Sequence, residues 1–178
     1  KKSIFILLIF LVQIFSQQKY LSKDDIKKEW SEYTSFQKSE LINHSNLLFD
    51  NGKYEDALLN YFQFVYLYPN DQLINAAYFK IAKCYEMLKS WDLSINYYQK
   101  IISSSDSSSV HYLSSNYQRL YSLFKIGQFQ DIINSPNEDN DPYILVFKAY
   151  AFFSMLDFNS ALLTFKSAEA AFDHRYYS

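Results

Sequence analysis

Apolar side chains recur every three or four positions along most of the chain, the spacing that places them on one face of an α-helix. The pattern starts at Ser22, which with Asp25 three residues later resembles the beginning of a helix. It predicts a lead-in helix over residues 22–37. A longer helical domain is expected over residues 38–178, where short polar turns separate the apolar stretches. The sequence therefore predicts an all-α protein.

Four segments of the predicted helical domain share one internal pattern. A tight turn precedes an aromatic residue, a small or apolar residue follows three positions later, and three of the segments have another aromatic residue four positions further on. These positions are Tyr54, Ala57 and Tyr61; Trp91, Ser94 and Tyr98; Phe129 and Ile132; and Phe158, Ala161 and Phe165. Both glycines of the chain, Gly52 and Gly127, fall in the turn, where a left-handed backbone is easiest for glycine. The offsets between the first aromatic residues, 37, 38 and 29 positions, predict stacked antiparallel helix pairs.

The repeated segments resemble the tetratricopeptide repeat family, whose motif is a helix–turn–helix of about 34 residues. The resemblance covers residues 38–171 and implies a right-handed superhelix of antiparallel helix pairs, an α-solenoid with about four repeats. The third repeat departs most from the motif, because Pro136 stops its second helix early and Arg119 stands where an apolar residue is usual. The run Tyr68-Pro69-Asn70-Asp71 is most similar to bacterial periplasmic members of the outer-membrane assembly lipoprotein and Tol-Pal-associated types.

Residues 1–16 have the pattern of an export signal. Lys1 and Lys2 precede an apolar stretch of about 14 residues, which is shorter than the roughly 20 residues that span a membrane as a helix. The preferred interpretation is a secretory signal cleaved near Ser16, and a retained signal anchor and a buried helix are the alternatives. We therefore expect an exported chain in a periplasmic or secretory compartment, associated with a membrane only if residues 1–16 are retained.

Composition and motifs argue against catalysis and against several classes of ligand. The net charge of −2, from 17 basic and 19 acidic residues, does not give the basic surface typical of nucleic-acid binding. Two glycines are too few for phosphate-binding loops. The histidines, His44, His111 and His174, are far apart in the sequence, and Cys84 is the lone cysteine and is expected to be a buried free thiol. We expect no enzyme activity, no cofactor and no metal site.

In the tetratricopeptide repeat family, the first helix of each pair lines the concave face of the superhelix, so the resemblance implies where a partner binds. The candidates for partner contact are Phe49, Phe79, Lys83, Tyr117, Tyr121, Phe124, Tyr150 and Phe153; Ile42, Asn46, Glu86 and Tyr143 share the same face. This aromatic lining suits an apolar segment of a protein or peptide.

The expected function is a non-enzymatic protein–protein interaction scaffold of the cell envelope or secretory compartment. Two alternatives stay open. In one, the aromatic rings pack only on one another. In the other, the aromatic face is a binding module for a glycan or another small ligand.

Overall fold

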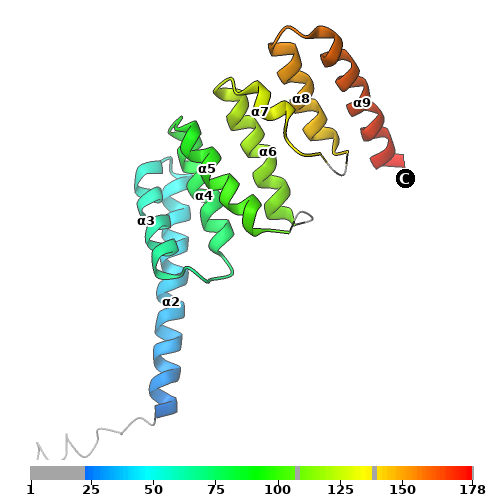
Figure 1. Cartoon of the computed structure of the whole chain (residues 1–178). Helices are drawn as coiled ribbons and strands as arrows, with labels where there is room; N and C mark the ends of the chain where they lie inside the picture. The colour runs from blue at the N-terminus through cyan, green and yellow to red at the C-terminus, as the bar shows by residue number, and fades with distance from the viewer. Residues whose placement is uncertain (1–22, 107–108, 138–139, 178) are drawn as a thin grey trace, which may run out of the picture. The chain divides into compact units, whose positions relative to one another are not determined.

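The computed structural model describes the backbone of residues 23–106, 109–137 and 140–177, and side chains within residues 37–106, 109–137 and 140–174. This part of the chain forms eight helices and contains no strand (Figure 1). The helices are α2 (Lys23–Asp50), α3 (Tyr54–Leu67), α4 (Ile74–Met87), α5 (Trp91–Ser104), α6 (Val110–Lys125), α7 (Phe129–Ile133), α8 (Pro142–Ser154) and α9 (Phe158–Tyr177). The all-α prediction is confirmed for the described residues, and the predicted signal segment, residues 1–16, lies outside them.

Contacts divide the chain into two compact units, residues 1–40 and residues 41–178. Helix α2 runs unbroken from Lys23 to Asp50, so the predicted lead-in helix and the first helix of the first repeat are one helix. The carboxyl-terminal part of α2, residues 41–50, belongs to the second unit together with every later helix. All eight candidate contact residues therefore lie in the second unit.

The second unit is an array of helix pairs. Three-residue turns join α2 to α3, α4 to α5, α6 to α7 and α8 to α9. From α3 onward each helix packs against the next one along the chain, and first helices of successive pairs also touch, α4 with α6 and α6 with α8. Such packing between consecutive helices is consistent with an α-solenoid.

The four turns inside the pairs have the same backbone geometry. The middle residue of each turn has a positive φ: 74° at Gly52, 59° at Lys89, 75° at Gly127 and 64° at Leu156. The residue after it donates its backbone N–H to the carbonyl oxygen five residues earlier, over 2.8 to 3.0 Å. This is a Schellman-type helix end. The predicted placement of both glycines in the turn is confirmed, and two residues with side chains adopt the same conformation.

The residues that the repeated pattern places after each turn are buried. Ala57, Ser94, Ile132 and Ala161 are at most 2% exposed. The aromatic residues four positions further on are fully buried in the first two pairs. There, each tyrosine hydroxyl donates to a polar side chain on the first helix of its own pair, Tyr61 to Asn46 over 2.6 Å and Tyr98 to Glu86 over 2.9 Å.

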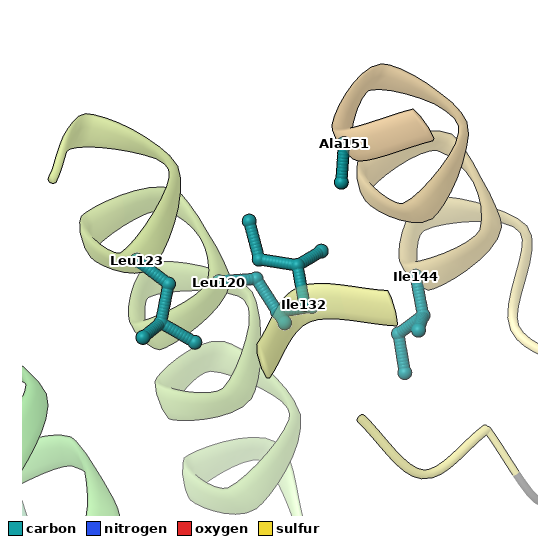
Figure 2. Close-up of a cluster of buried hydrophobic side chains, with 5 residues drawn as sticks. All are labelled: Leu120, Leu123, Ile132, Ile144 and Ala151. Carbon is teal, nitrogen blue, oxygen red and sulfur yellow. The ribbon is translucent and has the colours of Figure 1, made fainter. Parts of the chain in front are cut away.

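The third pair is shorter than its neighbours. Helix α7 has five residues, whereas α3 and α5 each have 14. Pro136 lacks a backbone N–H and disfavours helical conformation in the residue before it, so the predicted early end of this helix is confirmed. Helix α7 still contributes Ile132 to the core, where it lies between Leu120 and Leu123 of α6 and Ile144 and Ala151 of α8 (Figure 2).

The left-handed turn residues predict opposite effects of two substitutions. Leu156→Gly should raise the free energy of unfolding by about 0.5–1 kcal/mol, because relief of the left-handed strain exceeds the entropy cost of glycine. The Leu156 side chain is 73% exposed, so little packing is lost. Gly127→Ala should lower the free energy of unfolding by about 1 kcal/mol, because the added Cβ has space but the backbone is strained. Urea unfolding measures the change in the free energy of unfolding for each variant. Changes of the same sign in the two variants would contradict the shared turn geometry.

The buried alanines predict a second effect. Ala57→Leu and Ala161→Leu should each lower the free energy of unfolding by about 1–3 kcal/mol, because the helices approach closely and leave no space for a larger side chain. Ala170→Leu on the exposed side of α9 is the matched control and should change it by less than about 0.5 kcal/mol. If the urea midpoints of both core variants equal that of the control, the predicted register of the repeats is wrong.

Candidate functional site

A cavity of about 410 Å³ lies where the first helices of three pairs meet. Its lining comes from α2, α4 and α6, together with the residue that precedes α4: Ile42, Asn46, Leu73, Ala76, Phe79, Lys80, His111 and Ser114. A cavity of this size can enclose a large apolar side chain. Of the eight candidate contact residues, only Phe79 lines it, together with Ile42 and Asn46 from the same predicted face.

The ionisable residues that line this cavity are basic. Lys80 and His111 are its ionisable lining residues, and no carboxylate is among the residues that line it. The ammonium group of Lys80 lies 4.4 Å from the centre of the Phe49 ring, a cation–π distance. Phe49 also packs edge-on against Tyr54, with 5.4 Å between ring centres. Phe49 therefore contacts a lysine that lines the cavity.

Lys83 and Glu86 belong to a polar network between α4, α5 and α6. Lys83 forms an ion pair with Glu86 and donates to Gln118 over 3.3 Å. Glu86 is 5% exposed and also accepts hydrogen bonds from Tyr98 and Ser122. Burial raises the pKa of the Tyr98 hydroxyl, and the Glu86 charge raises it further. Lys83 is thus already paired with side chains of the protein itself.

Two aromatic candidates on α6 point into the protein. Tyr117 donates its hydroxyl to Asp141 over 2.6 Å, and its ring centre lies 5.5 Å from that of Tyr143. Phe124 packs edge-on against Phe129 at 5.4 Å. Both are partly buried against the core that Figure 2 shows. For these two residues the interpretation that the rings pack on one another accounts for the contacts.

Three other aromatic candidates are exposed. Tyr121 is 38% exposed, Tyr150 is 51% exposed and Phe153 is 55% exposed. Each has one edge-on ring neighbour, which is Trp91, Phe165 and Phe158 respectively. Lys125 lies over the Tyr121 ring at 5.1 Å. Each of these rings packs against a neighbouring ring on one side and is partly exposed.

Lys80 and His111 are the basic cavity residues, and the repeat pattern identifies neither of them. Lys80 directly follows Phe79 and so lies off the face that the helical period selects. His111 stands at the amino-terminal end of α6, one pair further along the chain. Only the packing of three helices brings Lys80 and His111 together, and helical spacing within one segment cannot predict this packing.

Comparisons with known proteins give no family for this chain: no protein-family model and no curated protein matches it. Within the described residues, no helix has the length and apolar character needed to cross a membrane. The same residues contain no group of three or more His, Cys, Asp or Glu side chains placed to hold a metal ion.

The buried network around Glu86 predicts a loss of stability on truncation. Glu86→Ala should lower the free energy of unfolding by about 1–3 kcal/mol, because the buried Tyr98 hydroxyl loses its acceptor. Glu86→Gln keeps an acceptor and should cost less. Glu169→Ala, at an exposed position of α9, is the control. Urea unfolding of the three variants decides the matter, and a Glu86→Ala midpoint equal to that of Glu169→Ala would contradict a structural role for the network.

Proposed function

We propose that the chain is a tetratricopeptide-like scaffold without enzyme activity that binds a segment of another protein. The cavity between α2, α4 and α6 carries this proposal, because it joins residues from three helix pairs in one mainly apolar depression whose lining includes two basic residues. A pocket that is mainly apolar with a few polar groups is the usual form of a binding site.

The exposed rings of Tyr121, Tyr150 and Phe153 extend the proposed surface along α6 and α8. Large rings held by neighbours lose little side-chain entropy on binding, which is why aromatic residues dominate the binding energy of many interfaces. We propose a partner segment with a bulky apolar side chain for the cavity and an acidic residue near it, facing Lys80 and His111. Export to the cell envelope or a secretory compartment is part of the same proposal and rests on the pattern of residues 1–16.

Selection of random peptides on the immobilised chain tests the binding proposal. We expect the selected peptides to combine a bulky apolar residue with an acidic one. Their dissociation constants, measured by calorimetry, should rise about thirtyfold for the double variant Tyr121→Ala with Phe153→Ala, because truncation of central aromatic residues typically has an effect of this size.

Tyr66→Ala is the matched control, because Tyr66 is 84% exposed on α3, the second helix of its pair. Circular dichroism should show that both variants keep their helices. Equal binding to the double variant and the control would contradict the proposed face. Displacement of the peptides by excess oligosaccharide would favour the alternative of a glycan-binding module.

A further inference from the structure

A second cavity, of about 420 Å³, lies between α5, α6 and the end of α7. Ile95 and Ile102 of α5 and Leu123 of α6 supply apolar walls, and Arg119 and Asp131 supply charge. This cavity is distinct from the one between α2, α4 and α6, with which it shares no lining residue. It lies at the junction between the second and third helix pairs.

The equivalent junction between the first and second pairs is filled by aromatic rings. The rings are those of Phe62 on α3, Tyr78 and Tyr85 on α4, and Tyr97 on α5. Tyr97 contacts the other three rings, with 5.8 to 6.0 Å between ring centres. Beneath these rings lies Ile81, which is fully buried.

When successive pairs are aligned on the first residue of their second helices, a different residue stands at each of these five positions of the next junction. Gln99, Asn116, Leu123 and Ser135 take the positions of the four rings, and Arg119 takes the position of Ile81. All five line the cavity. The hollow is therefore the space that four rings occupy one pair earlier, and the early end of α7 leaves it accessible from outside.

Arg119 is only partly satisfied within the protein. Its Nη2 atom donates to Asn116 over 3.2 Å and to Ser135 over 3.1 Å, while its buried Nε atom has no hydrogen-bond partner among the described residues. Burial lowers the pKa of its guanidinium, although the nearby negative charge of Asp131 opposes the shift. A guanidinium still carries its charge under these conditions. Among the described residues no carboxylate lies within ion-pair distance of it, so this desolvated charge favours an anionic ligand.

We propose that this cavity is a binding site for an organic carboxylate with an apolar ring, in which the carboxylate contacts Arg119 and the ring fills the space between Ile95, Ile102 and Leu123. The ring supplies the packing that Phe62 and its neighbours supply at the preceding junction. The carboxylate pairs with the guanidinium charge of Arg119. The same chemistry occurs in a free small acid and in the carboxyl terminus of a peptide that ends in phenylalanine.

Calorimetry with 3-phenylpropionate and its neutral amide tests the charge requirement. The acid should bind, and the amide should bind at least about tenfold more weakly, because hydrogen bonds to a charged partner are the stronger ones. A peptide ending in phenylalanine with a free carboxyl terminus, compared with its amidated form, distinguishes the two sources. Equal affinity for acid and amide, or no binding of any probe up to about 5 mM, overturns the proposal.

Substitutions at the cavity test its location. Gln99→Phe introduces the residue of the preceding junction, so it should raise the urea midpoint and abolish binding of 3-phenylpropionate. Asp131→Asn removes the opposing charge and should tighten binding about two- to fivefold. Lys166→Gln, at an exposed position of α9, is the charge control and should leave binding unchanged.

Arg119→Gln should abolish binding of 3-phenylpropionate. Because Arg119 also joins α6 to Ser135, loss of binding in this variant could follow from loss of that link. Asp131→Asn leaves the link intact and tests the charge of the cavity by itself. Retained binding in Gln99→Phe would overturn the site even if Arg119→Gln fails to fold.

Discussion

The backbone hydrogen bond that ends each first helix determines the rest of the array. It runs from the residue after the left-handed position to a carbonyl five residues earlier, and it reverses the chain within three residues. The reversal brings the second helix against the first at a fixed register. For that reason Ala57, Ser94, Ile132 and Ala161 reach equivalent buried positions in four pairs. Lys89 and Leu156 take the conformation that Gly52 and Gly127 adopt freely, although it is strained for residues with a side chain.

The described structure uses its aromatic residues in two ways. Between the first two pairs, partly buried rings pack on one another around Tyr97. On α6 and α8, the rings of Tyr121, Tyr150 and Phe153 are partly exposed and each packs against a supporting ring. The first group stabilises the array, and the second carries the proposed contact with a partner. The large aromatic content therefore has two physical roles.

Much of the fold follows from local sequence, because turns and small residues act at short range. The turn glycines, the buried alanines and the early end of α7 at Pro136 are all visible in the repeated pattern. The candidate face is less predictable, because helical spacing places a residue on a side of its helix without showing what covers it. Lys83 and Tyr117 lie on that side, yet Glu86 and Asp141 engage them within the protein. Lys80 and His111 border a cavity that exists only through the packing of three helices.

The contrast between the filled and the hollow junction has a consequence for cooperativity. The stability of a linear array is approximately a sum of contributions from its repeats and from the contacts between neighbours. Four rings couple the first two pairs, whereas Gln99, Asn116 and Ser135 replace three of them at the following junction. The contact between the second and third pairs therefore lacks the ring packing that joins the first two pairs. A molecule that fills the hollow would add contacts between those two pairs, and its binding free energy would appear as a more cooperative unfolding transition of the whole array.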